Sequence, residues 1–265
     1  IFAGLTTFFA MCYIVVVNPS QVAGGGATGW LAEAGADKVA LGQIWNAVYI
    51  ATILAATIGT LLYAFYAKLP FAQASGMGLN SFFFVSFILP QVISGGDVVE
   101  GYHAGLVIIL ISGIIFMILS VTGAREYIAK AMPECLKKSI SAGIGLFITF
   151  IGFQNVGIIQ DNPYTLTQFV DIHGAIMGDG IITVMPAILA LIGFLIIVAL
   201  EKKGIKGNVM IGIIATTVLY YITTGASISL DMGQVGQAFK DFAEVGVVGV
   251  FKPESWANAF SPQFV

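Results

Sequence analysis

Long apolar runs alternate along this chain with short stretches rich in charged residues, glycine, asparagine and aspartate. About 20 helical residues cross the hydrocarbon core of a bilayer, so an apolar run of that length indicates a membrane-spanning helix. The pattern predicts seven such segments, at residues 1–22, 44–66, 70–92, 104–123, 138–159, 181–200 and 207–225. We therefore expect an all-α, multi-pass integral membrane protein.

Composition and charge agree with this prediction and add an orientation. Hydrophobic residues make up 58% of the chain and charged residues only 9%. Lysine and arginine collect in alternate connections, and positive residues near segment ends stay on the cytoplasmic side. We therefore expect a plasma (inner) membrane protein with a cytoplasmic amino terminus. The inner connections then hold Lys68, Arg125, Lys130, Lys137, Lys138, Lys202, Lys203 and Lys206, and the outer ones hold Lys38, Lys240 and Lys252.

The third predicted segment, residues 70–92, is broken by helix-disrupting residues at its start. Pro70 lacks an amide hydrogen and favours extended geometry at the preceding residue, so the second segment should end near Lys68. Gly76 and Gly78 allow a turn or the close approach of a ligand, and Asn80 is suited to cap the half-helix that follows. Broken helices of this kind recur at transporter substrate sites.

The same residues have a plainer interpretation. Glycine and proline are common in membrane helices that bind nothing, and small residues often serve only to pack one helix closely against another. Taken alone, the broken segment leaves a binding site and a packed kink equally open.

Three blocks of sequence, in the same order, resemble one known family. They are Gly4–Pro19 (GLTTFFAMCYIVVVNP), Ser75–Phe83 (SGMGLNSFF) and Ser141–Gly152 (SAGIGLFITFIG). The chain is similar in these blocks to the AzgA-like purine permeases of the nucleobase/cation symporter-2 family. The family commonly has leucine and proline where Gln73 and Ser75 stand here, and these departures bear on the choice of purine more than on the fold.

The resemblance implies an architecture. Members of the family have fourteen membrane segments in two inverted repeats of seven, arranged as a core domain and a gate domain. Residues 1–159 would then carry segments one to five, mostly core domain, and residues 160–230 would carry segments six and seven of the gate. Residues 231–265 would be the outer connection to a missing segment eight. The remaining C-terminal half of the transporter is then a required partner, and it would supply the carboxylates of the site.

The resemblance also implies an activity and a site. We expect a secondary active transporter that imports hypoxanthine, guanine or adenine by cation-coupled symport and alternating access, with a proton or sodium as coupling ion and no cofactor. Its substrate-binding residues would be Ala74, Ser75, Gly76, Met77, Gly78 and Asn80 of the broken segment, with Tyr13 and Ile14 of the first. Membrane lipid is an expected partner, and a homodimer is an assembly that the resemblance allows.

Other functions stay open at this point. An anion transporter of the same architecture would hold sulfate or a carboxylate at the dipole of the half-helix. A structural membrane subunit would need no site at all. An enzyme would need embedded His, Asp or Glu residues, which the predicted segments lack, so we expect none. Nucleic-acid binding has no support, because no basic stripe with interleaved aromatic residues is present.

Several polar residues have expected structural roles. Asn18 with Pro19 is expected to end the first segment as a cap, and Gln154 with Asn155 to end the fifth. His103 and His173 are expected to be solvated side chains of the outer connections.

Two charged stretches allow two interpretations each. Residues 124–138 form either an amphipathic helix on the inner surface or a charged linker. The stretch after Asp231 packs either on the outer membrane face or against the missing half.

Overall fold

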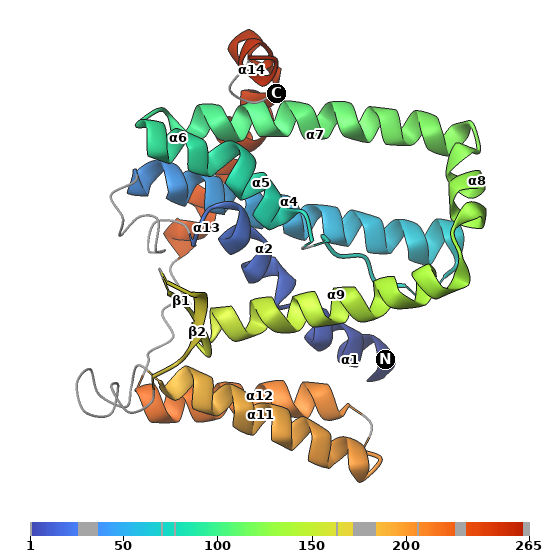
Figure 1. The fold of residues 1–265 in the computed structure, drawn as a ribbon, viewed down its shortest axis with the longest axis vertical. Helices are drawn as coiled ribbons and strands as arrows, with labels where there is room; N and C mark the ends of the chain where they lie inside the picture. The colour runs from blue at the N-terminus through green and yellow to red at the C-terminus, as the bar shows by residue number, and fades with distance from the viewer. Residues whose placement is uncertain are drawn as a thin grey trace. The chain divides into compact units, whose positions relative to one another are not determined.

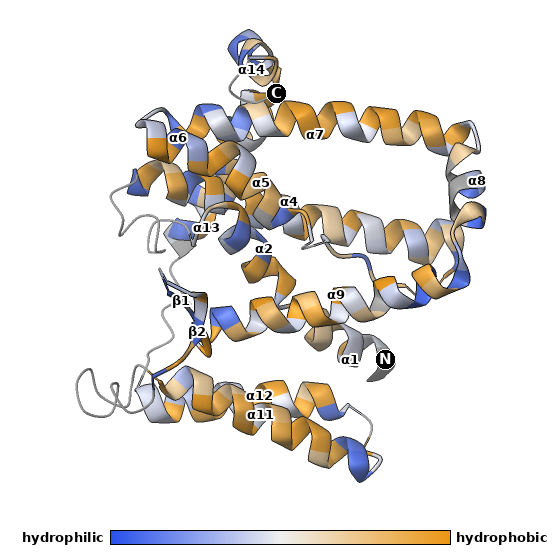
Figure 2. Ribbon diagram, in the orientation of Figure 1, coloured by the Kyte–Doolittle hydropathy of each residue, from blue (hydrophilic) through white to orange (hydrophobic). Residues whose placement is uncertain are grey.

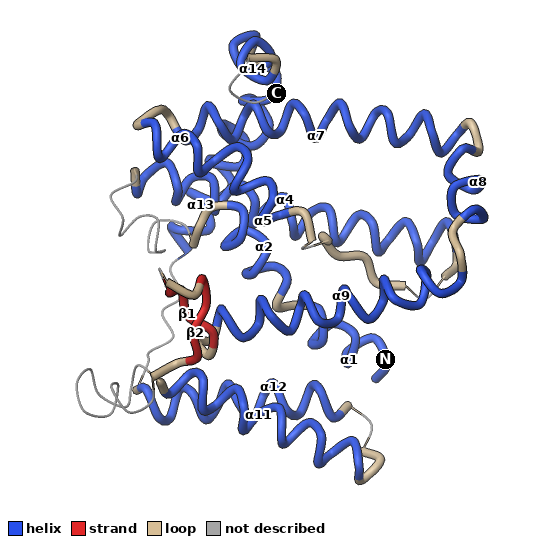
Figure 3. Tube along the Cα trace, in the orientation of Figure 1, coloured by secondary structure: helices blue, strands red, loops and turns tan. Residues whose placement is uncertain are grey.

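A computed structural model describes residues 2–25, 37–69, 71–76, 78–162, 164–171, 184–205, 207–225 and 232–261. These residues are mostly helical (Figure 1 and Figure 3). The chain divides into two compact units. One comprises Ile1–Met11 with Lys138–Leu230, and the other comprises Cys12–Lys137 with Asp231–Val265. Each unit thus combines segments that lie far apart in the sequence.

Five helices in the described residues are long and apolar enough to cross a membrane: Gly4–Val22, Lys38–Ala67, Val98–Val121, Glu134–Asn155 and Met185–Lys202. Figure 2 shows the apolar residues along them in orange. The predicted helical membrane protein is confirmed in this coarse sense. Two further predicted segments correspond to shorter apolar helices, Phe84–Ser94 and Asn208–Thr224. The count of seven and the broken third segment stay predictions.

The second unit contains most of the helices. They are α2 (Ile14–Val22), α4 (Lys38–Leu62), η2 (Tyr63–Ala67), α5 (Asn80–Phe83), η3 (Phe84–Ile88), α6 (Leu89–Ser94), α7 (Val98–Val121), α8 (Ala124–Ala131), α13 (Met232–Asp241), η5 (Phe242–Val247), η6 (Val248–Phe251) and α14 (Pro253–Ala259). The first turns of the two longest helices have aspartate caps. Asp37 accepts hydrogen bonds from the amides of Val39 (2.9 Å) and Ala40 (3.3 Å), and Asp97 accepts one from Val99 (2.8 Å).

Two π-helical turns flank the loop before α5. Helix α4 continues into η2 and ends at Lys68, whose left-handed backbone (φ 53°) stops the helix where the sequence predicted. On the other side, α5, η3 and α6 follow one another without a gap from Asn80 to Ser94. The π-helical turn η3 lies just before Pro90, which has no amide hydrogen to donate to the preceding turn.

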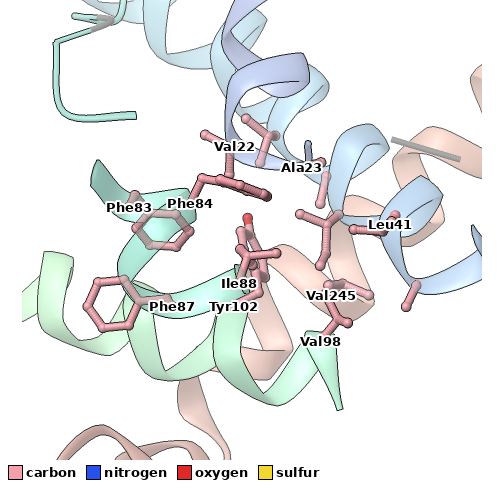
Figure 4. Close-up of a cluster of buried hydrophobic side chains, with 14 residues drawn as sticks. Val22, Ala23, Leu41, Phe83, Phe84, Phe87, Ile88, Val98, Tyr102 and Val245 are labelled. Carbon is pink, nitrogen blue, oxygen red and sulfur yellow. The ribbon is translucent and has the colours of Figure 1, made fainter. Parts of the chain in front are cut away.

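A cluster of buried apolar side chains joins these helices (Figure 4). Phe83, Phe84, Phe87 and Ile88 project from α5 and η3, and Tyr102 meets Phe83 edge to face with ring centroids 6.0 Å apart. The rest of the cluster comes from α2 and the turn after it, α4, α7 and η5: Val22, Ala23, Ala40, Leu41, Ile44, Ala47, Val48, Val98 and Val245. The half-helix that begins at Asn80 is therefore anchored by aromatic packing.

Glycines on α7 let this half-helix approach closely. A Cβ atom added at Gly101 would lie 2.3 Å from the carbonyl oxygen of Phe87, and one added at Gly105 would lie 2.4 Å from the ring of Phe83. The two glycines are four residues apart, so they share one face of the helix. Small residues at this spacing are typical of closely packed membrane helices.

The position expected for His103 is wrong. Helix α7 begins at Val98, so His103 lies inside it and is buried rather than solvated. Its Nε2 lies 3.0 Å from the carbonyl oxygen of Val245 in η5. His173 lies outside the described residues.

The stretch after Asp231 packs within its own unit, against α4 and α7. Asp241 is buried and accepts hydrogen bonds from Asn46 of α4 (2.7 Å) and from Gln237 (2.9 Å). Val245, a few residues later, belongs to the apolar cluster. The sequence predicted this stretch either on the outer membrane face or against the missing half, and neither alternative included packing against α4 and α7.

The charged stretch after α7 is helical at its start. Helix α8 carries an exposed ion pair between Glu126 and Lys130, with 2.7 Å between the charged atoms. Exposed pairs one turn apart contribute only a few tenths of a kcal/mol, about 0.3–0.5. The helical interpretation of these residues is confirmed for Ala124–Ala131.

The first unit contains α1 (Phe2–Met11), most of α9 (Glu134–Asn155), α11 (Met185–Lys202) and α12 (Asn208–Thr224). Helix α9 ends at Asn155, as predicted. Glycines bring α11 and α12 together, since a Cβ at Gly193 would lie 2.2 Å from Thr216 and one at Gly212 would lie 2.2 Å from Ile197. The all-helical prediction did not include a short antiparallel hairpin of β1 (Ile159–Asn162) and β2 (Leu166–Phe169), drawn in red in Figure 3.

Replacing Gly101 by alanine tests the close packing of α7 on the half-helix. The added methyl group has no room beside the Phe87 carbonyl, so Gly101→Ala should destabilise the purified full-length protein by about 1–3 kcal/mol. Gly113→Ala on the same helix is the control, because a Cβ there meets nothing within 4 Å and alanine favours the helix by up to about 1 kcal/mol. Thermal unfolding in detergent measures both. Equal stabilities of the two variants would contradict the packing.

Candidate functional site

The loop between η2 and α5 has no regular secondary structure in described residues 71–76. Its backbone rests on α4, since the amide of Gln73 donates a hydrogen bond to Oγ1 of Thr60 (3.0 Å). Gly59 makes room for this contact, because a Cβ there would lie 3.1 Å from Cβ of Gln73. No other backbone hydrogen bond joins residues 71–76 to the rest of the described chain. The loop therefore presents backbone donors and acceptors that a ligand can use.

Asn80, at the start of α5, belongs to a chain of polar side chains on three helices. Its Nδ2 donates a hydrogen bond to Oδ1 of Asn18 on α2. Nδ2 of Asn18 donates in turn to Oγ1 of Thr52 on α4 (2.6 Å). Thr52 also contacts the carbonyl oxygen of Val48 one turn earlier (2.6 Å). Asn18 and Thr52 are both buried, so the apolar interior around them strengthens these bonds.

The predicted site residues of the loop differ in their surroundings. Ala74 and Ser75 are half-buried, and Oγ of Ser75 is buried without a hydrogen-bond partner among the described residues. Gly76 and Gly78 are exposed, and a Cβ added at either would meet no described residue within 4 Å. Met77 lies outside the described residues. Within the described residues, the two glycines therefore pack against no neighbouring helix.

Tyr13 and Ile14 lie where the first predicted segment is interrupted. Helix α1 ends at Met11 and α2 begins at Ile14, with a turn at the two residues between them. Tyr13 is exposed, whereas Ile14 is buried and lies one turn before Asn18 on the same face of α2. Of the two residues, Ile14 therefore lies on the face of α2 that carries Asn18, whereas the side chain of Tyr13 is exposed.

The cap role expected for Asn18 is wrong. Asn18 and Pro19 lie inside α2, which continues to Val22, and the Asn18 amide is used between helices. Thr52 was not singled out in the sequence at all. A polar side chain within an apolar segment was the available signal for both residues, because such groups need partners inside the protein.

The chemistry of this site is neutral. Its side-chain groups are amides and hydroxyls, and its backbone adds further donors and acceptors. No group of three or more His, Cys, Asp or Glu residues able to hold a metal ion occurs in the described part of the chain. Such a site is suited to hydrogen-bond an uncharged polar molecule.

Comparison with known proteins identifies the family. A model of the family described as "Permease family" matches residues 1–262. The chain belongs to this permease family. The predicted resemblance to nucleobase/cation symporters is confirmed, and so is the prediction that the chain is a permease rather than an enzyme, since the family and its relatives are permeases.

Three of the relatives show what the chain resembles. The permease is 39% identical over 218 residues to guanine/hypoxanthine permease PbuG of Bacillus subtilis, which is 82% of this chain and 44% of PbuG. It is 36% identical over 223 residues to guanine/hypoxanthine permease PbuO of the same bacterium, 84% of the chain and 44% of PbuO. Adenine permease AdeP of Escherichia coli is 33% identical over 219 residues, 83% of the chain and 42% of AdeP. The chain thus spans less than half the length of these relatives.

Removing the Asn18 amide tests whether the polar chain holds the helices together. Asn18→Ala leaves Nδ2 of Asn80 without its acceptor and Oγ1 of Thr52 without the donor that it accepts from, which should cost about 1–3 kcal/mol of stability. Asn155→Ala, at the exposed end of α9, should stay within about 0.5 kcal/mol of the unaltered permease. Thermal unfolding of both variants in detergent measures the difference. The role of Asn18 would be disproved if the two variants were equally stable.

Proposed function

We propose that the intact permease imports purine nucleobases by cation-coupled symport and alternating access. The observation that carries this proposal is the placement of Asn80, held by Asn18 at the end of a non-helical loop between apolar helices. The names of the relatives, which are guanine/hypoxanthine and adenine permeases, point to the same substrates. A neutral purine offers ring N–H donors, ring nitrogen acceptors and an oxo or amino group, which match the neutral groups of the site.

The proposed binding residues are those of the loop and α2: Ala74, Ser75, Gly76, Met77, Gly78, Asn80, Tyr13 and Ile14. The buried hydroxyl of Ser75, which has no hydrogen-bond partner among the described residues, supports this set, because a polar group in apolar surroundings is costly unless a ligand completes its hydrogen bond. The open space at Gly76 supports it as well, since a flat ring can approach the backbone there. A proton or sodium is the proposed coupling ion.

The proposed transport cycle needs the other half of the protein. In our proposal the broken third segment belongs to a repeat of seven, and a second repeat supplies the carboxylates that complete the purine site. Rigid movement of a core domain against a gate domain then exposes the site to each side of the membrane in turn. The core and gate division is a prediction separate from the two compact units described above.

Uptake of radiolabelled hypoxanthine tests the substrate. The full-length permease, expressed in cells that lack their own purine permeases, should give saturable uptake that guanine or adenine inhibits and that uracil and sulfate do not. Purine-sensitive uptake would support the proposal, whereas uptake of sulfate in place of hypoxanthine would favour an anion transporter.

Within this assay, Asn80→Ala should lower hypoxanthine uptake at least about fivefold without lowering membrane abundance. The variant loses one hydrogen bond to the substrate, and a loss of roughly 1 kcal/mol corresponds to about fivefold in affinity. Asn155→Ala is again the control and should transport normally. Unchanged uptake kinetics of the Asn80 variant would remove this residue from the site.

Cysteine labelling tests the proposed orientation, in which the amino terminus is cytoplasmic. Cys135 is exposed and lies in a predicted inner connection, so a membrane-impermeant maleimide should label it only after the cells are permeabilised. The other cysteines are first replaced by serine. For comparison, Tyr164→Cys in the exposed hairpin turn should be labelled in intact cells. The reverse pattern at the two positions would invert the orientation.

A further inference from the structure

Thr52 is a buried residue of α4, outside the set expected to touch the substrate. Its Oγ1 lies 2.6 Å from the carbonyl oxygen of Val48 and 2.6 Å from Nδ2 of Asn18. A carbonyl oxygen can only accept a hydrogen bond, so the single hydroxyl proton of Thr52 is committed to Val48. Oγ1 of Thr52 is therefore left as an acceptor toward Asn18.

This commitment fixes the direction of the next two hydrogen bonds. Asn18 has to turn its N–H group toward Thr52, because the reversed amide would place two oxygen atoms together with no proton between them. Oδ1 of Asn18 then faces Asn80, and Asn80 has to donate through Nδ2. Oδ1 of Asn80 accepts no hydrogen bond from any described residue. Thr52 thus determines that Nδ2 of Asn80 is hydrogen-bonded within the protein and that Oδ1 is left for a ligand.

We infer that Thr52 is a positioning residue that acts through Asn18 to hold the Asn80 amide in one orientation, with Oδ1 presented to an N–H group of the substrate. The inference rests on the proposed function for its substrate. It adds to that function the direction of one hydrogen bond, in which the substrate donates and Asn80 accepts. The ligand class is a neutral heterocycle with a ring N–H or amino group at that point. A heterocycle that offers only a ring-nitrogen acceptor there would face an oxygen.

Discrimination between substrates follows from the fixed amide. An acceptor that the bound substrate covers without supplying a donor costs about 1–3 kcal/mol, which corresponds to roughly fivefold to 150-fold in affinity. Without the Thr52 hydroxyl, the Asn18 amide loses the acceptor that orients it, and both amides can reverse. The reversed Asn80 amide would then present N–H to the substrate, and the preference for a donor would be lost.

Competition by hypoxanthine analogues in the full-length permease tests this consequence. In the 1-deaza, 7-deaza and 9-deaza analogues, C–H replaces one ring nitrogen with little change of shape. The unaltered permease should bind at least one of them about tenfold more weakly than hypoxanthine. In Thr52→Val this ratio should fall to about threefold or less, with membrane abundance kept. Thr52→Ser retains the hydroxyl and should restore the full ratio.

The outcomes against the inference are specific. A Thr52→Val permease that keeps the whole discrimination would overturn the inference, because orientation would then not depend on the hydroxyl. A general loss of transport rate with an unchanged ratio would indicate a merely structural role for Thr52 and would overturn it equally.

A double-mutant cycle on thermal unfolding tests the hydrogen-bonded chain from Thr52 to Asn80, and it does so independently of what the protein transports. Thr52→Val and Asn80→Ala each disturb the same hydrogen-bonded chain, so the Tm loss of the double variant should be smaller than the sum of the single losses by at least about 2 °C. Thr217→Val is the matched control, since this exposed threonine makes the same bond to a carbonyl oxygen one turn earlier (2.8 Å, to Ile213) and should be additive with Asn80→Ala. Additive Tm losses for Thr52→Val and Asn80→Ala would show that the two residues are not coupled and would overturn the inference. Absence of purine uptake with a non-additive cycle would instead reject the proposed substrate and leave the positioning role in place.

Discussion

Polar groups on the apolar helices of this permease have to find partners inside the protein, because hydrocarbon offers them none. This constraint explains why Asn18, Thr52 and Asn80 form one chain across α2, α4 and α5. It also explains the buried carboxylate of Asp241 in α13, which accepts hydrogen bonds from the amides of Asn46 on α4 and of Gln237. In both places at least one hydrogen bond joins elements that are distant in the sequence, and such bonds help to specify which surfaces meet.

Close packing at glycine supplies the second requirement, which is a rigid support for the site. The half-helix that begins at Asn80 lies directly against α7 because Gly101 and Gly105 leave its backbone and the Phe83 ring enough room. The aromatic cluster around Phe83 and Tyr102 then fills the remaining space. A loop that has few hydrogen bonds of its own is in this way held between two well-packed helices, α4 before it and the half-helix after it. Sites carried by packed elements keep their geometry better than sites on free loops.

The proposed function and the positioning role of Thr52 depend on different features. The function rests on the relatives' names and on a neutral, partly unsatisfied site. The positioning role rests on the hydrogen-bond capacities of a hydroxyl, two amides and a carbonyl group, which hold for any ligand. Together they describe a site in which the protein decides the polarity of one contact before the substrate arrives, so that no reorganisation is needed on binding.

The sequence by itself determined the apolar segments, the end of the second helix near Lys68, the start of a half-helix close to Asn80 and the family, although Asn80 opens this helix and does not cap it. These features depend on local properties, such as the length of apolar runs, the missing amide hydrogen of proline and short ordered motifs. Only the tertiary structure decided that Asn18 bonds between helices instead of ending one, that His103 is buried against η5, and that Thr52 is hydrogen-bonded to Asn18. A polar side chain has the same composition and spacing whether it faces water, a cap or another helix. Its partner is chosen by which helices pack together, and that choice is made by contacts between residues far apart in the chain.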